Sequence, residues 1–167
     1  MGSQMIDRII NLLLLAAVAY IMSAGGASSP RGPNDPDYIV GEIAPSLSGV
    51  DYRDSDRTIV LYLRSTCRYC VESMPWFEKL SQQAQTTGAR VVVISRQEQE
   101  VLERFVTDSD LSVFTTVSVG LDAWPKLTNT PGIVVVGRDG TVRGSWRGRL
   151  SDESQREIIR AVIETHP

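Results

Sequence analysis

Short runs of apolar residues, rich in β-branched side chains, recur along the chain between polar segments. Residues 58–63 (TIVLYL), 91–94 (VVVI) and 133–136 (IVVV) are three such runs. Runs of this length without polar interruptions are typical of strands buried on both faces of a sheet. Two further strands are predicted at 115–119 and 141–146, and the tripeptide RDG before the last of them is typical of a hairpin turn.

Between the strands, apolar residues recur every three or four positions, as expected for amphipathic helices. The first helix is predicted to begin near Cys67 and to run to about Gln85, with Gly88 ending it. A second helix is predicted over 98–106, and a last one after Ser151, a candidate N-cap. The expected buried faces are Met74, Phe77, Leu80 and Ala84 in the first helix, Val101, Leu102, Phe105 and Val106 in the second, and Ile158, Ile159, Val162 and Ile163 in the last.

The order of these elements predicts an α/β domain. A strand–helix–strand unit with parallel strands comes first, and a hairpin followed by a helix closes the chain. Both halves can share one mixed central sheet with helices on both faces. We assign this domain to residues 38–167, a length that fits a single core without disulfide staples.

The N-terminus is more apolar than the rest of the chain. Residues 9–22 read IINLLLLAAVAYIM, and small residues follow up to position 27. The length is borderline against the roughly 20 residues of a spanning helix, so 1–27 is predicted to be a signal anchor or a signal peptide forming one hydrophobic helix. A buried core helix is disfavoured because no polar stripe interrupts the segment. Residues 28–37, rich in proline and polar residues, are predicted to be a linker.

Charge and residue counts exclude several functions. The net charge is −3, from 17 basic and 20 acidic residues, so nucleic-acid binding is not expected. The chain has two cysteines and one histidine, His166, at its extreme end. A Ser–His or Cys–His catalytic arrangement and a histidine-based metal site are therefore disfavoured.

The two cysteines form the motif Cys67-Arg68-Tyr69-Cys70, where the first strand gives way to a helix. Unpaired N–H groups and the positive end of the helix dipole stabilise a thiolate at such a position. Arg68 is predicted to lower the pKa of Cys67 further, and Tyr69 offers an aromatic surface. An inert disulfide would close too short a loop to stabilise the fold, and half a zinc site would lack two ligands. A redox function for this pair is therefore favoured.

Two prolines are notable. Pro75 falls inside the first predicted helix, where a missing N–H should kink it. Pro131 precedes the strand at 133–136, in a position that suits a turn or an edge. From sequence alone a trans bond is expected at Pro131, because only about 5–6% of such bonds are cis.

Three runs together resemble a known family: IVLYLRSTCRYCVESMPWFEKL, VVVISR and NTPGIVVVGRDGTV. They are similar to the thioredoxin superfamily, and most to its exported, often membrane-anchored TlpA/ResA-like branch. The segment VGEIAPSLSGVD also resembles the N-terminal extension of that branch. The similarity covers roughly residues 38–165 and implies a thioredoxin-like fold.

The resemblance also implies roles for single residues. Cys67 would be the nucleophile and Cys70 the resolving cysteine. Pro131 would be the family's cis-proline and Thr130 the residue whose backbone pairs with an extended substrate. Pro75 would be the helix-kinking proline.

Three positions depart from the family pattern. Thr66 stands where a tryptophan is common, Leu61 where thioredoxin has a buried aspartate, and Ser73 where the TlpA-like branch often has a glutamate. Glu72 lies one place early and is expected to point elsewhere, because one residue turns a helix by about 100°.

We therefore expect an exported thiol–disulfide oxidoreductase, facing the extracytoplasmic space, that acts as a reductase of partner proteins. Its partners would be protein thiols and disulfides, the membrane through the N-terminal helix, and a membrane or soluble protein that recycles the pair. Neither a metal nor a cofactor beyond the Cys67–Cys70 disulfide is expected. The alternatives are a thiol peroxidase, with Thr66 and Arg64 beside one cysteine, and a Cu(I)-binding assembly factor.

Overall fold

The structure is a computed structural model that describes residues 37–109, 111, 114–120 and 122–163. The predicted signal or anchor segment at 1–27 and nearly all of the predicted linker at 28–37 lie outside these residues. Within the described part of the chain, no helix combines the length and the hydropathy that a membrane span requires.

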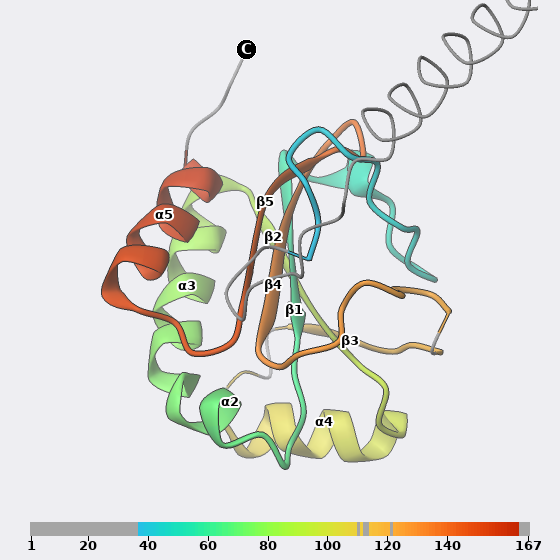
Figure 1. The fold of residues 1–167 in the computed structure, drawn as a ribbon, viewed down its shortest axis with the longest axis vertical. Coiled ribbons are helices and arrows are strands. Elements are labelled where there is room, and N and C mark those ends of the chain that lie inside the picture. The colour runs from blue at the N-terminus through green and yellow to red at the C-terminus, as the bar shows by residue number, and fades with distance from the viewer. Residues whose placement is uncertain (1–36, 110, 112–113, 121, 164–167) are drawn as a thin grey trace, which may run out of the picture. The chain divides into compact units, whose positions relative to one another are not determined.

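Five strands form one mixed sheet in the order β3-β2-β1-β4-β5 (Figure 1). The bounds of the strands are β1 Arg57–Tyr62, β2 Arg90–Ser95, β3 Thr115–Ser118, β4 Gly132–Gly137 and β5 Val142–Arg147. β1, β2 and β3 are parallel to one another, whereas β4 is antiparallel to both β1 and β5. All five predicted strands are thus confirmed, as is the mixed sheet.

The helices are η1 (Tyr52–Asp54), α2 (Arg68–Glu72), α3 (Met74–Thr87), α4 (Gln99–Asp108) and α5 (Asp152–Ile163). The three-residue 3₁₀ helix η1 was not among the elements predicted from the sequence. The predicted cap of the last helix is confirmed, because the Ser154 N–H donates to Ser151 Oγ at 3.2 Å. Gly88 ends α3 as predicted, in a left-handed conformation with φ of 70°.

The first predicted helix is not continuous, because it divides into α2 and α3 at Ser73. Pro75 has no N–H, so the Val71 carbonyl cannot receive the bond that a continuous helix would need. The Ser73 carbonyl instead accepts the N–H groups of Trp76 and Phe77 and starts a new helix. Pro75 thus lies in the first turn of α3, where an N–H is not required. The kink predicted at this proline is confirmed in the form of a break.

One face of the sheet is covered by all three longer helices. Side chains of α3, α4 and α5 join the same apolar cluster as Ile59 and Leu61 of β1, and α3 and α5 lie side by side (Figure 1). Two crossover connections that continue in one direction across the sheet, from β1 to β2 to β3, carry their helices to the same face when both have the usual right-handed sense.

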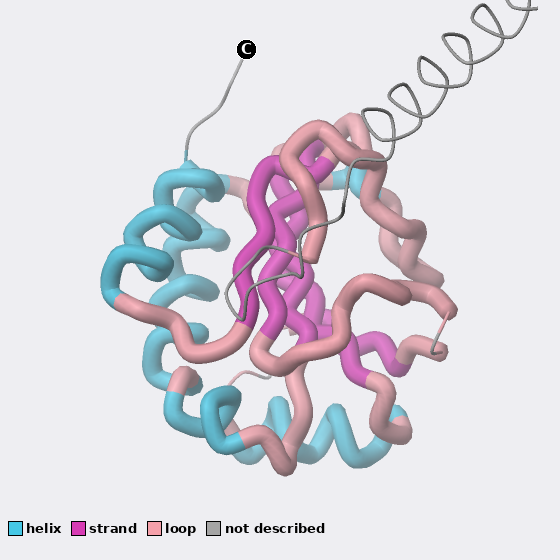
Figure 2. Tube along the Cα trace, viewed as in Figure 1, coloured by secondary structure: helices cyan, strands magenta, loops and turns pink. Residues whose placement is uncertain are grey.

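The other face has a different cover. Val60 and Tyr62 of β1 pack there against Leu47 and Val50 of the N-terminal extension and against Trp124 from the connection between β3 and β4. Figure 2 shows irregular segments, drawn in pink, along this side of the sheet. The expected thioredoxin-like fold is confirmed, and on this face η1 and irregular segments take the place of an α-helix.

The strand register brings three connections to one end of the sheet. Tyr62, the last residue of β1, pairs with Gly132 at the start of β4 and with Ile94 near the end of β2. The segments that follow β1 and β2 and the segment that precedes β4 must therefore meet at this end. Cys67, Gln97 and Thr130 lie on these three segments.

Replacing Phe77 by alanine should test the packing of α3 on the sheet. Phe77 is fully buried in the apolar cluster between α3 and β1. Phe77→Ala is expected to lower the free energy of unfolding by about 3–5 kcal/mol, because it removes a large buried side chain and leaves a cavity. Urea denaturation followed by circular dichroism measures the change.

Ile163→Ala is the control for this measurement, because Ile163 at the end of α5 is 48% exposed. Its cost should stay within about 0.5–1 kcal/mol. Equal costs for the two variants would contradict the packing described for α3.

Candidate active site

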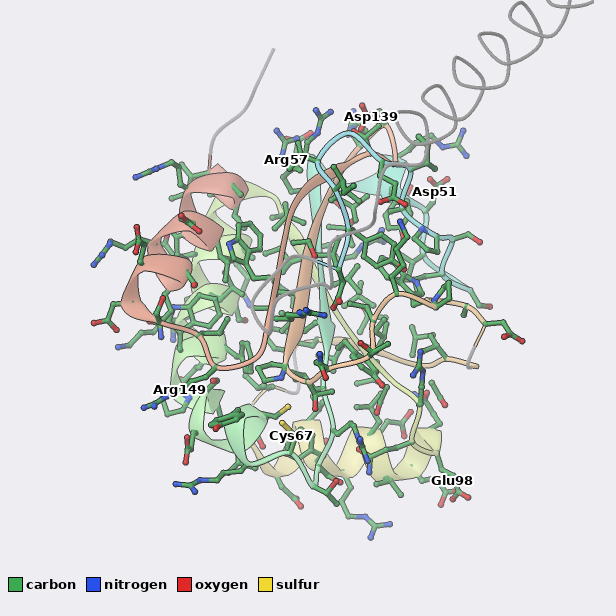
Figure 3. The ribbon with its side chains drawn as sticks, viewed as in Figure 1. Asp51, Arg57, Cys67, Glu98, Asp139 and Arg149 are labelled. Carbon is green, nitrogen blue, oxygen red and sulfur yellow. The ribbon has the colours of Figure 1, made fainter. Side chains whose placement is uncertain are left out.

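Cys67 occupies the N-cap position of α2, with extended backbone angles. Its Sγ accepts a hydrogen bond from the Cys70 backbone N–H at 3.2 Å. Its thiol also donates to the Thr130 carbonyl at 3.3 Å. Figure 3 shows Cys67 at the end of the domain where α2 begins. The strand register therefore brings together two of the predicted site segments that are far apart in sequence.

The environment of Cys67 favours its thiolate. Partial burial acts against ionisation, but hydrogen bonds from the Cys70 and Thr130 side chains and from the backbone N–H groups of Cys70 and Tyr69 outweigh it, so the pKa of Cys67 is lowered. These backbone groups are the unpaired donors of the first turn of α2. Because α2 is only five residues long, these direct hydrogen bonds, which were expected from the sequence, stabilise the thiolate more than a long helix dipole does.

Cys70 lies one turn further along α2 and is fully buried. Burial raises the pKa of Cys70 to about 12, and the hydrogen bond and the charge of Cys67 act in the same direction. The backbone N–H of Arg64 and the Thr130 side chain act weakly against this shift. Both cysteines are free thiols. The pair thus consists of one accessible, acidic thiol and one buried thiol that holds its proton.

Thr130 lies directly beside the thiols, and Pro131 follows it in the chain. The peptide bond between them is cis, as the resemblance implied. Pro131 is buried, and its carbonyl accepts the Gly148 N–H at 2.8 Å. The following residue, Gly132, has little room for a side chain, because a Cβ there would lie 3.1 Å from Leu127 Cδ2 and 3.3 Å from the Asn129 carbonyl. The segment before β4 is therefore held tightly against the end of the sheet.

Arg68 and Tyr69 point outward from α2. The Arg68 side chain is 86% exposed and pairs with Glu72, with 2.6 Å between Nε and Oε1. The groups that shift the pKa of Cys67 most are hydrogen bonds and burial, and Arg68 is not among them. The predicted tuning by Arg68 thus stays a prediction, with its charge directed to Glu72. Tyr69 is 44% exposed and leaves an aromatic surface next to the cysteines.

Two residues that the sequence analysis did not single out complete the site. The side-chain amide of Gln97 accepts the Ser65 N–H through Oε1 at 2.8 Å and donates to Ser65 Oγ through Nε2 at 2.8 Å. Ser65 lies two residues before Cys67. Parallel pairing of β1 with β2 brings the ends of both strands together, so this neighbourhood follows from the predicted topology although no motif marks it.

In the described part of the chain, no group of three or more His, Cys, Asp or Glu side chains is placed to hold a metal ion.

Selective alkylation should distinguish the two cysteines. Iodoacetamide at pH 7.5 is expected to modify Cys67 at least about tenfold faster than Cys70, because the thiolate is the reactive form and only Cys67 is both accessible and acidic. Peptide mapping by mass spectrometry measures the two rates, and unfolding in guanidinium should make them similar. Comparable rates in the folded protein would contradict the described asymmetry.

Comparisons with known proteins agree with this geometry. Residues 44–145 match the model of the AhpC/TSA family. The thioredoxin domain of a thiol-disulfide oxidoreductase from Bacteroides vulgatus has a similar structure, with a TM-score of 0.60 and 16% identity over 75% of this chain and 99% of that chain. A thiol:disulfide interchange protein of the thioredoxin family from Chlorobium tepidum gives a TM-score of 0.60 and 16% identity over 76% and 99% of the two chains.

A secreted disulfide oxidoreductase from Mycobacterium tuberculosis is also similar, with a TM-score of 0.52 and 22% identity over 73% of this chain and 94% of that chain. No curated protein matches the sequence significantly. The structural likenesses confirm the thioredoxin-like fold, and the family match covers more than half of the chain. The chain therefore belongs to the AhpC/TSA family.

Proposed function

We propose that the protein reduces disulfide bonds of partner proteins, with Cys67 as the attacking thiol and Cys70 as the resolving thiol. The observation that carries this proposal is the opposite environment of the two sulfurs. Cys67 is accessible and its pKa is lowered, whereas Cys70 is buried and its pKa is raised to about 12. One thiol is ready to attack, and the other keeps its proton until it is needed.

In the first step, the Cys67 thiolate attacks one sulfur of a substrate disulfide. The substrate S–S bond breaks, a mixed disulfide forms between Cys67 and the substrate, and the departing sulfur leaves as a thiolate. In the second step Cys70 gives its proton to that thiolate and attacks Cys67 Sγ, which breaks the mixed disulfide. The second substrate sulfur leaves as a thiolate and takes a proton from solvent. The substrate is thereby reduced by two electrons to a dithiol, and the protein is oxidised to the Cys67–Cys70 disulfide.

Formation of the mixed disulfide itself prepares Cys70 for the second step. The hydrogen bond and the negative charge of Cys67 are among the causes that raise the pKa of Cys70. Both disappear once Cys67 is bonded to the substrate, while the Arg64 N–H still favours a Cys70 thiolate. Burial, the largest cause of the raised pKa of Cys70, remains, so the reaction of Cys67 removes only part of the barrier to ionisation of Cys70.

Thr130 would align the substrate. Its carbonyl lies 3.3 Å from Cys67 Sγ, so a peptide that pairs with this backbone would present its disulfide to the nucleophile. Tyr69, at 44% exposure, would contact apolar residues beside that disulfide. Pairing with the main chain would allow substrates of many sequences to bind, because the hydrogen bonds go to the substrate backbone rather than to particular side chains.

The environment of Cys67 supports reduction over oxidation. A strong oxidant of this kind owes its high potential to a strongly stabilised reduced form. Here the Arg68 charge is paired with Glu72, and burial offsets part of the hydrogen bonding that lowers the pKa of Cys67, so the stabilisation of the reduced form is limited. A dithiol protein, membrane-bound or soluble, would return the pair to its reduced state.

The proposed location is extracytoplasmic, with the domain tethered or exported through residues 1–27. The apolar run in this segment supports the proposal, as does the description of the similar Mycobacterium tuberculosis protein as secreted. Disulfide substrates form and persist in such compartments.

Peroxide reduction is the rival activity within the same family. It would place a threonine and an arginine around the reactive cysteine, yet Thr66 and Arg64 are both exposed. Among the described residues, neither side chain forms a hydrogen bond with Cys67 Sγ. Reduction of hydrogen peroxide faster than that of a protein disulfide would favour the rival.

Variants of the two cysteines should separate their roles. Cys67→Ser is expected to abolish reduction of insulin disulfides by the dithiothreitol-coupled enzyme, because no attacking thiolate remains. Cys70→Ser should lower turnover at least about a hundredfold and accumulate a mixed disulfide at Cys67, since resolution is lost. Non-reducing electrophoresis and mass spectrometry detect the trapped complex. Trapping on Cys70 in the Cys67→Ser variant would contradict the assignment.

The direction of electron flow can be measured directly. We expect the Cys67/Cys70 pair, equilibrated with glutathione buffers, to have a potential near about −270 mV, as in thioredoxin. Mass spectrometry after acid quenching and alkylation reports the fraction oxidised, with Cys67→Ser as the control. A potential near about −120 mV would instead identify an oxidant and overturn the reductase assignment.

A further inference from the structure

Gln97 lies in the segment after β2, and its side chain bonds to the β1–α2 connection. Both segments lie at the end of the sheet where the thiols are found. The Gln97 backbone is held at the exits of β2 and β3, where its N–H donates to Ser95 Oγ at 3.2 Å and its carbonyl accepts Ser118 Oγ at 2.7 Å. The residue is thus fixed to the sheet before its side chain makes any contact.

The side chain of Gln97 then reaches across to the connection between β1 and α2. Both polar atoms of the amide bind Ser65. Oε1 accepts the Ser65 backbone N–H and Nε2 donates to the Ser65 hydroxyl, each at 2.8 Å. A primary amide supplies an acceptor and a donor in one rigid plane, so it restrains both the position and the orientation of Ser65.

Ser65 directly follows Arg64, whose backbone acts on both cysteines. The Arg64 carbonyl accepts the Cys67 N–H at 3.1 Å, and the Arg64 backbone N–H is among the groups that act to lower the pKa of Cys70. Cys67 itself follows Ser65 by two residues. A shift of Ser65 would therefore move the N-cap of α2 and the donor that faces Cys70 together.

We propose that Gln97 is a positioning residue, which holds the β1–α2 connection through Ser65 and thereby sets the reactivity of Cys67. Without the amide, the Ser65 N–H would lose its partner and the connection could move away from the arrangement that directs N–H groups at Cys67 Sγ. The proposed role concerns the same thiol pair as the proposed function and rests on it for its biological meaning.

The chain provides a matched control in Gln99. Its side chain makes a comparable set of bonds to β3, accepting the Ser118 N–H at 2.7 Å and donating to the carbonyl and hydroxyl oxygens of Thr116 at 3.2 and 3.0 Å. It fixes the edge of the sheet, and among the described residues its printed partners lie in α4 and β3 rather than in the β1–α2 connection. A purely structural contribution from Gln97 should therefore resemble that of Gln99.

The test compares Gln97→Met with Gln99→Met in the full chain. The second-order rate of iodoacetamide reaction at Cys67 is measured from pH 5 to pH 10, together with the thermal midpoint of unfolding. Gln97→Met is expected to slow the reaction at pH 7 by about three- to tenfold and to move the midpoint of the pH profile upward. Gln99→Met should lower thermal stability similarly and leave both rate and profile unchanged.

Equal profiles for the two variants would overturn the proposal. If Gln97→Met does not fold, Ser65→Ala decides, because it removes only the hydroxyl half of the contact. It should slow the reaction by about twofold, and an unchanged rate would also overturn the proposal. Alkylation needs no disulfide substrate, so a wild-type protein without turnover would disprove the proposed function while this comparison still tests Gln97.

Discussion

The pairing of β1 with both of its neighbours is the constraint on which the site depends. Every residue of β1 is buried, so its backbone groups must be satisfied by strands on both sides. The resulting register sets Tyr62 beside Gly132 and Ile94. A slip of one residue would turn the apolar side chains of β1 to the wrong faces, and it would also separate Cys67 from Thr130. The same pairing that builds the core therefore assembles the reactive centre.

The chemistry of the thiol pair follows from small differences in position. Cys67 and Cys70 share one turn of α2, yet one sulfur meets N–H donors at the surface and the other lies in the apolar cluster. Their pKa values move in opposite directions because hydrogen bonding favours the thiolate and desolvation opposes it. The difference in acidity between the two thiols thus arises from burial and hydrogen bonding.

The break at Ser73 changes the electrostatic account of the site. A helix that ran on from Cys67 would place a long dipole behind the nucleophile, whereas α2 has five residues. Since the influence of a helix dipole is confined to its terminal turn, the loss is small and the direct N–H bonds dominate. Arg64, Ser65 and Gln97 position those donors. Changes in their contacts are therefore expected to change the reactivity of Cys67.

The sequence by itself determined the strands, the approximate helices and the thiol pair, because apolar periodicity and the spacing of Cys67 and Cys70 are local properties. The resemblance to the thioredoxin superfamily added the cis bond at Pro131. Only the tertiary structure decided that irregular segments cover the second face and that Gln97 binds Ser65. These contacts join residues that are brought together by the strand register. The register cannot be predicted from a local sequence pattern. The pair Cys67 and Cys70 could thus be found by reading the chain, whereas their unequal acidity depends on contacts that exist only in the folded domain.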